Sequence, residues 1–240
     1  MALTALGLGL GSAIASAGLL ATASFAPSPY RPEPGYDLLF QRKNSLAGWH
    51  GRRAFWHAEG EDVCGSLRQV QGPDHSALRQ RRFLRHFWLG WGDFEHRMEA
   101  KLSGNISPGD HVLFRYRWEP DGPSPGAAYE TRLGDPISAT GALLEPNGRG
   151  LLIHPHSVAF ATPSRPMEAG LFRAQEWNQI TIRAVANHLV HQVNGTVTTD
   201  YVDQNPKLRR ERGAIALGFD FAGDSAATAS FRHVRIRTLD

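Results

Sequence analysis

Apolar and polar residues alternate along much of the chain, most clearly near the C-terminus. Ile180, Ile182 and Ala184 fall on one side of an extended segment, and Thr181 and Arg183 fall on the other. Successive side chains of a β-strand point to opposite faces of its sheet. The spacing therefore predicts a strand with one buried face.

Asn194 and Gly195 form the strongest turn signal in the sequence, because they lie between two strand-like runs of similar length. Both residues tolerate a positive φ, which a two-residue type I′ turn requires. We predict a β-hairpin here, followed by a closing strand, SFRHVRIRTL, that is paired inside a sheet.

The same period of two recurs earlier in the chain. In residues 94–101, Phe94, His96, Met98 and Ala100 alternate with charged residues. In residues 111–118, the alternation predicts one face with Val112, Phe114, Tyr116 and Trp118, and a second face with Leu113, Arg115 and Arg117. Short alternating strands separated by turns predict one all-β domain over residues 36–240, an antiparallel β-sandwich.

The N-terminus has a different character. No charged residue precedes Arg31, and residues 3–25 consist of Leu, Ile, Ala, Gly, Ser, Thr and Phe. A helix of about 20 apolar residues crosses a bilayer, so residues 1–28 are predicted to form a retained helical membrane anchor. The alternative is a secretory signal. The stretch LLATASFA offers small-residue cleavage sites for one, but the basic n-region is missing.

The anchor has features suited to contact with other helices. Gly7 and Gly11 provide a small-residue face for close helix packing, and Leu19 and Leu20 add apolar surface. We therefore expect integral membrane proteins and lipid as its partners. The proline-rich residues 29–35 are expected to form a stiff linker to the sandwich.

Composition excludes some classes of protein. The formal net charge is +3, and the basic residues do not interleave with a recognisable nucleic-acid module, so no nucleic-acid partner is expected. Cys64 is the single cysteine, which excludes an internal disulfide, and no Cys/His spacing resembles a zinc site. His154 and His156 lie two residues apart, but Pro155 between them favours a turn. We predict neither a metal site nor a cofactor.

Several motifs follow one another in order: YDLLF, WGDFEHRMEAKLS, a strand ending in FRYR, AYETRLGD, EWNQITI, HQVNG and SFRHVRIRTL. This succession resembles the 3-keto-disaccharide hydrolase family over roughly residues 36–240. The resemblance implies a concanavalin A-like jelly-roll sandwich and chemistry on sugars oxidised at carbon 3. In that chemistry a base removes the carbon-2 proton, a cation or metal stabilises the enediolate, and the carbon-1 substituent leaves by elimination.

The resemblance also suggests site residues. Glu130, in AYETR, matches an acidic position in the family's tyrosine-glutamate strand and is the candidate base. The other candidates are Arg115 and Arg117 as oxyanion stabilisers, with Asp135 and His111 as their neighbours. A divalent metal is compatible with this chemistry. The structural alternative is that Glu130 pairs with Arg132 or Arg117 across a sheet.

Residues 87–91, FWLGW, place three large aromatic rings beside a basic loop. Core packing is the first interpretation, an interface with membrane or protein the second, and stacking against a sugar the third. Strand alternation would direct Phe87, Leu89 and Trp91 to one side and Trp88 to the other. Trp88 and Trp91 are the candidate partner-binding residues.

Two functions from different classes follow. The first is a non-catalytic, membrane-attached subunit that stabilises a membrane complex, for example a respiratory or photosynthetic one. The second is a hydrolase or lyase acting on 3-keto-disaccharides. A bacterial inner-membrane location is expected. The positive charges after the anchor favour a cytoplasmic domain, whereas the family resemblance favours a periplasmic one.

Overall fold

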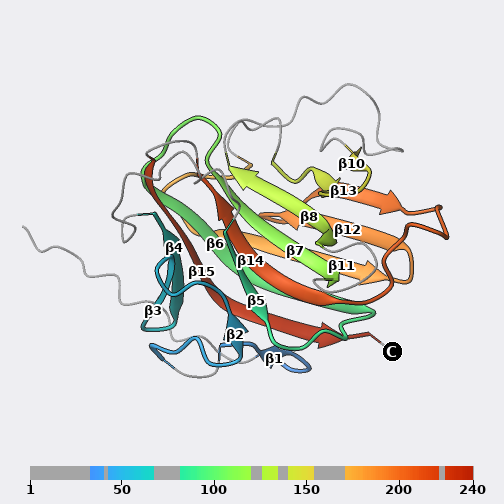
Figure 1. Cartoon of the computed structure of the whole chain (residues 1–240), viewed down its shortest axis with the longest axis horizontal. Coiled ribbons are helices and arrows are strands. Elements are labelled where there is room, and N and C mark those ends of the chain that lie inside the picture. Colours follow the sequence, from blue (N-terminus) through green and yellow to red (C-terminus); the bar gives the residue numbers. More distant parts are fainter. Residues whose placement is uncertain are drawn as a thin grey trace, which may run out of the picture. The chain divides into compact units, whose positions relative to one another are not determined.

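Two antiparallel β-sheets pack face to face in the computed structural model (Figure 1). The structure describes residues 33–40, 43–67, 82–119, 126–134, 140–153, 171–221 and 225–239. Within these ranges every regular element is a β-strand. The prediction of an all-β antiparallel sandwich is therefore confirmed.

The eight-stranded sheet has the order β13-β12-β11-β6-β15-β4-β3, and β1 also pairs with β15. Its strands are β1 (Asp37–Leu38), β3 (Trp56–Glu59), β4 (Asp62–Ser66), β6 (Phe94–Asn105), β11 (Asn178–Val185), β12 (His188–Val193), β13 (Thr196–Val202) and β15 (Ala226–Thr238). The predicted C-terminal strand corresponds to β15, which is paired on both sides, by β6 and by β4.

The seven-stranded sheet has the order β10-β9-β8-β7-β14-β5-β2. Its strands are β2 (Trp49–His50), β5 (Arg82–His86), β7 (His111–Glu119), β8 (Ala127–Gly134), β9 (Leu143–Glu145), β10 (Gly150–Ile153) and β14 (Ala214–Asp220). In the view of Figure 1, β8, β7, β14 and β5 run side by side. This sheet carries most of the candidate site.

The predicted hairpin is present between β12 and β13. Asn194 and Gly195 have φ angles of 49° and 80°, and Val193 pairs with Thr196 across the turn. The Asn194 side chain also accepts a hydrogen bond from the Gln179 backbone at 2.9 Å. This contact ties the turn to β11.

The alternation predicted for residues 94–101 and 180–184 is confirmed, because the apolar positions are buried between the sheets. Full burial of a Phe or Ile side chain contributes about 1.5–3 kcal/mol. The core extends across both sheets. For example, the rings of Trp56 on β3 and Phe219 on β14 lie 5.3 Å apart.

The alternation predicted for residues 111–118 is wrong at its end. Arg117 has a φ of +48°, and the register between β7 and β8 shifts between Tyr116 and Glu119, which marks a β-bulge. The extra residue turns Trp118 away from the core face. Its ring lies 5.6 Å from that of Phe83, on the opposite side of the sheet from Tyr116.

The predicted anchor, with Gly7, Gly11, Leu19 and Leu20, lies outside the described residues, as does the predicted linker up to residue 32. Among the residues that are described, no helix is long and apolar enough to cross a membrane.

Candidate functional site

The candidate site lies on the outer face of the seven-stranded sheet, which we define as the face turned away from the core. On β7 and β8 the core face carries Tyr116 and Tyr129, so the intervening residues point outward. Arg115 pairs with Glu130, and Leu113 pairs with Arg132. Strand pairing therefore brings a carboxylate and two guanidinium groups together.

The neighbouring strand β14 contributes small residues to the same face. Ala216 lies opposite Arg115, and Gly218 lies opposite Leu113. The ring of Phe83, on β5, covers Gly218 so closely that an added Cβ would lie 2.5 Å from it. The absence of a side chain at Gly218 thus allows Phe83 to approach Arg115.

Glu130 lies between two arginines. Arg115 Nε donates to its Oε2 at 2.8 Å, and Arg132 Nε donates to its Oε1 at 3.3 Å. The Glu130 side chain is 0% exposed, and the Arg115 side chain is 7% exposed. Hydrogen bonds between charged groups are stronger than neutral ones, so this cluster is held firmly in place.

Aromatic rings flank Arg115. Its guanidinium lies 4.0 Å from the centroid of the Phe83 ring and 5.6 Å from that of Trp118. Cation–π contacts of this kind stabilise a partly desolvated charge. The bulge at Arg117 is what places Trp118 here, and no local sequence signal marks that bulge.

His111 is on the same outer face, with the Leu113–Arg132 pair between it and Glu130. Burial lowers the pKa of its imidazole, and the Arg132 guanidinium lowers it further, so the ring is neutral near pH 7. Its Nε2 is buried and has no hydrogen-bond partner among the described residues. Asp220, on β14, is paired directly with His111 on β7.

Arg117 does not join the cluster. Its guanidinium donates to the carbonyl oxygens of Ala186 at 2.6 Å and Arg210 at 2.8 Å, and to Asp93 Oδ1 at 3.2 Å. These contacts tie the bulge to neighbouring loops. The structure thus brings Arg115 and Arg132 to Glu130, and directs Arg117 elsewhere. Asp135, His154 and His156 lie outside the described residues.

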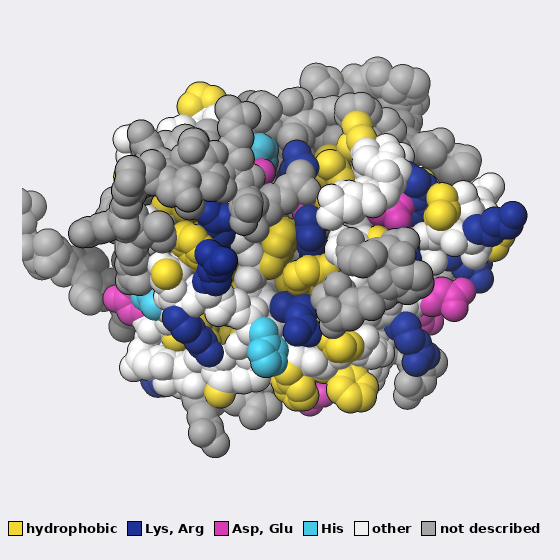
Figure 2. All heavy atoms as spheres, in the orientation of Figure 1, with side chains coloured by type: hydrophobic (Ala, Val, Ile, Leu, Met, Phe, Trp, Pro, Cys, Tyr) yellow, Lys and Arg dark blue, Asp and Glu magenta, His cyan; other side chains and the backbone are white. Residues whose placement is uncertain are grey.

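Figure 2, in the orientation of Figure 1, shows basic side chains among hydrophobic ones on the described part of this side. Among the exposed hydrophobic residues are Phe87, Trp88 and Leu89, with exposed fractions of 57%, 52% and 46%. Core packing is therefore wrong for these three. Because β5 ends at His86, strand alternation does not apply to them. Trp91 is half-buried, packs against the core and forms a bridge with Gly213.

A second polar cluster joins β8 to the segment after β13. Tyr129 donates to Asp203 Oδ2 at 2.5 Å, and Arg149 donates to both Asp203 oxygens, at 2.9 and 2.6 Å. Burial raises the pKa of Asp203, but these hydrogen bonds outweigh it and lower the pKa overall. A shallow hollow of about 710 Å³ lies beside Arg149 and residues 201–207. These contacts tie β8 and Arg149 to the segment after β13.

Comparison with known proteins identifies relatives of this sandwich. A family model described as a 3-keto-alpha-glucoside-1,2-lyase-like domain matches residues 35–237, which confirms the resemblance found in the sequence. No curated protein matches the sequence.

Several solved structures share the fold. A Bacillus licheniformis beta-glucanase is 13% identical with a TM-score of 0.58, over 85% of this chain and 97% of that one. A proposed glycosyl hydrolase from Parabacteroides distasonis ATCC 8503 is 16% identical with a TM-score of 0.55. The match covers 86% of this chain and 95% of the hydrolase chain. A Bacillus subtilis protein of unknown function with a galectin-like fold is 9% identical with a TM-score of 0.53. The match covers 85% of this chain and 98% of that protein's chain. At these identities the similarity shows the fold alone.

Proposed function

Because the chain belongs to the 3-keto-alpha-glucoside-1,2-lyase-like family, we propose that it cleaves glycosides oxidised at carbon 3, on the outer face of the seven-stranded sheet. The observation that carries this proposal is the Glu130 carboxylate between Arg115 and Arg132. It combines a proton acceptor with two fixed cations, which are the two groups that elimination from a keto sugar requires.

The proposed reaction begins with loss of the carbon-2 proton to Glu130. Each carboxylate oxygen accepts a hydrogen bond from one arginine, and the Glu130 side chain is 0% exposed, so the sugar reaches it when the Arg132 side chain, which is 24% exposed, moves aside. The C–H electron pair moves into a carbon-2–carbon-3 double bond, and the carbon-3 oxygen becomes an oxyanion. A guanidinium from Arg115 or Arg132 stabilises that negative charge.

In the second step the oxyanion re-forms the carbonyl, and the bond from carbon 1 to the glycosidic oxygen breaks. A carbon-1–carbon-2 double bond forms, and the departing oxygen takes up a proton. Water added across that double bond completes a net hydrolysis. The rings of Phe83 and Trp118 offer apolar surface beside Arg115, and pockets for small molecules are commonly lined by aromatic side chains with a few polar groups.

The test is release of free sugar from a 3-keto-disaccharide by the full-length chain in mild detergent. Glu130→Gln should lower turnover about 10²–10⁴-fold, the usual contribution of a positioned base. Glu99→Gln is the matched control, because Glu99 also accepts a hydrogen bond from an arginine, Arg232, at 2.7 Å, but on the other sheet. Full turnover by Glu130→Gln would rule out Glu130 as the base.

His111→Gln separates the two candidate bases. The neutral imidazole, whose Nε2 has no hydrogen-bond partner among the described residues, is a second group on this face able to accept a proton. If His111→Gln loses the larger share of turnover, the base is His111, and Glu130 serves to position the arginines.

A second candidate function is a non-catalytic subunit of a membrane complex. The exposed run Phe87, Trp88 and Leu89 favours it, because consecutive large apolar side chains at a surface are typical of contact sites. Absence of turnover on every keto-glycoside tried, with and without divalent metal, would favour this function. In that case Trp88→Ser should reduce copurification with membrane partners.

A further inference from the structure

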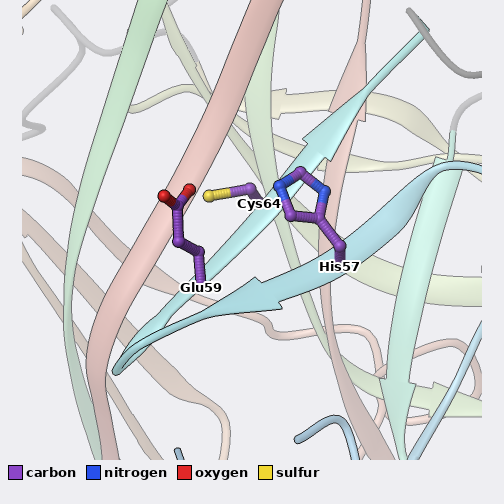
Figure 3. Close-up of side chains that lie close together, drawn as sticks. All are labelled: His57, Glu59 and Cys64. Carbon is purple, nitrogen blue, oxygen red and sulfur yellow. The ribbon is translucent and has the colours of Figure 1, made fainter. Parts of the chain in front are cut away.

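A cluster of three potential metal ligands lies on the eight-stranded sheet, away from the proposed sugar site. His57 and Glu59 come from β3, and Cys64 comes from β4 (Figure 3). Trp56 and Ala58, which alternate with the two β3 ligands, pack against the core. His57 and Glu59 therefore share the outward face, where His57 pairs directly with Cys64.

The ligand atoms of the three residues all lie within 4.8 Å of one another. Tetrahedral ligands at about 2.0–2.3 Å from one zinc ion lie roughly 3.3–3.8 Å apart, so the side chains would move together by up to about 1.5 Å to bind it. In the view of Figure 3 the Cys64 sulfur lies between the Glu59 carboxylate and the His57 ring. The two strands thus bring nitrogen, oxygen and sulfur ligands into one cluster.

We propose that this β3–β4 hairpin binds one divalent ion of the zinc class through His57, Glu59 and Cys64. The donor set decides the class of metal. Thiolate and imidazole ligands favour zinc and similar transition metals, whereas calcium and magnesium prefer oxygen ligands. Three protein ligands leave the fourth tetrahedral position to water or to Asp62, which pairs with Glu59 across the hairpin.

The surrounding charges are compatible with a divalent cation. A thiolate and a carboxylate neutralise the ion, and Asp62 adds a further negative charge. Two basic residues that face the cluster are Lys101 on β6 and Arg232 on β15. Arg232 is engaged by Glu99 at 2.7 Å, and both it and Lys101 lie against the ring of Trp177.

Cys64 is buried, and its sulfur lies 3.5 Å from Ser230 Oγ. A zinc ion would bind this sulfur as a thiolate and displace the thiol proton. The sequence alone did not indicate this site, because its ligands converge only through the hairpin register.

Such an ion would strengthen an edge of the fold. In the described part of the chain, β3 is the last strand of its sheet, paired with β4 through Trp56–Glu59. The hairpin turn contains Gly60, with a φ of +61°, which bonds to Asn44. A metal bridge between His57 and Cys64 would hold the two strands together and protect their amides from hydrogen exchange.

The direct test is titration of the chelator-treated full-length chain with Zn²⁺ by calorimetry, and with Co²⁺ by absorption. One ion per chain should bind, and Co²⁺ should give a near-ultraviolet thiolate charge-transfer band. Cys64→Ser should abolish that band. His57→Ala and Glu59→Gln should each weaken zinc binding at least about tenfold.

His188→Ala is the matched control, because His188 Nε2 contacts Asp200 at 2.7 Å on the same sheet but has no thiol beside it. It should leave zinc binding unchanged. No saturable zinc binding would overturn the proposal, as would binding that persists in both Cys64→Ser and His57→Ala. His57→Ala keeps the test decisive if Cys64→Ser fails to fold, because His57 is less buried than Cys64.

Discussion

Replacing Glu130 should reduce stability as well as activity, and the structure gives the expected size of the effect. Glu130 and Arg115 form a buried ion pair, with side chains 0% and 7% exposed. Removing one partner of such a pair costs about 3–5 kcal/mol, because the other charge is left in a medium of low dielectric constant. Glu130→Ala should fall in this range. Glu130→Gln keeps an oxygen acceptor, so a loss of about 1–3 kcal/mol is expected.

The assay is urea unfolding of each variant, followed by tryptophan fluorescence. In a domain of this size, 1 kcal/mol corresponds to a shift in melting temperature of about 2–4 °C, which thermal unfolding would detect independently. Arg115→Met and the Glu130→Gln/Arg115→Met double variant complete a double-mutant cycle. Because the two side chains are in contact, the double variant should be destabilised by less than the sum of the single variants.

A coupling energy below about 0.5 kcal/mol would refute the buried pair, since distant and independent sites give values of that size. Glu99→Gln again serves as the control. The side chains of Glu99 and Arg232 are both 22% exposed, so solvent screens their attraction, and the loss should stay below about 1 kcal/mol. If both glutamates gave equal losses, burial would not be the reason for the effect.

Two further predictions concern acid stability and the N-terminus. Burial lowers the pKa of His96 to about 3, and neither ring nitrogen has a hydrogen-bond partner among the described residues. Below about pH 6.5 the unfolded chain binds a proton that the folded chain excludes, so stability falls as the pH falls from there toward 3. Because the ring already stacks on Phe114, His96→Phe should raise the urea midpoint more at pH 5 than at pH 8, and an equal change at both would contradict this account. Deleting residues 1–28 should leave a folded sandwich that no longer sediments with membranes, and undiminished sedimentation of the truncated protein would show that these residues are not the anchor.

The parts of the fold that could be predicted from sequence are those with local causes. Alternation identified β6 and β11, and the conformational freedom of Asn194 and Gly195 identified the hairpin between β12 and β13. The bulge at Arg117 could not be predicted, because it results from the register of β7 against its neighbours. The bulge turns the Trp118 side chain to the outer face of the sheet. It also directs the Arg117 guanidinium away from Glu130.

The candidate site could be predicted only in part, because some of its contacts depend on strand register and not on local sequence. Sequence similarity suggested Glu130 as a candidate, and alternation placed Arg115 on the opposite face from Phe114 and Tyr116. The choice of Arg132 over Arg117 as the second arginine depended on which side chains the strand register brings together. Likewise, the exposure of Phe87 and Trp88 depended on where β5 ends, which hydrophobicity alone does not determine.

The two proposed sites differ in a way that makes their tests independent. Glu130 lies on the outer face of the seven-stranded sheet, and Cys64 lies on the outward face of the eight-stranded sheet, with the hydrophobic core between them. Substitutions at distant sites with no shared partners usually have additive effects on stability. Zinc binding should therefore be unchanged in Glu130→Gln, and keto-sugar cleavage should be unchanged in His57→Ala. If His57→Ala lost cleavage while remaining folded, the metal would be linked to the reaction, and the separation of the two sites by the core would no longer explain their behaviour.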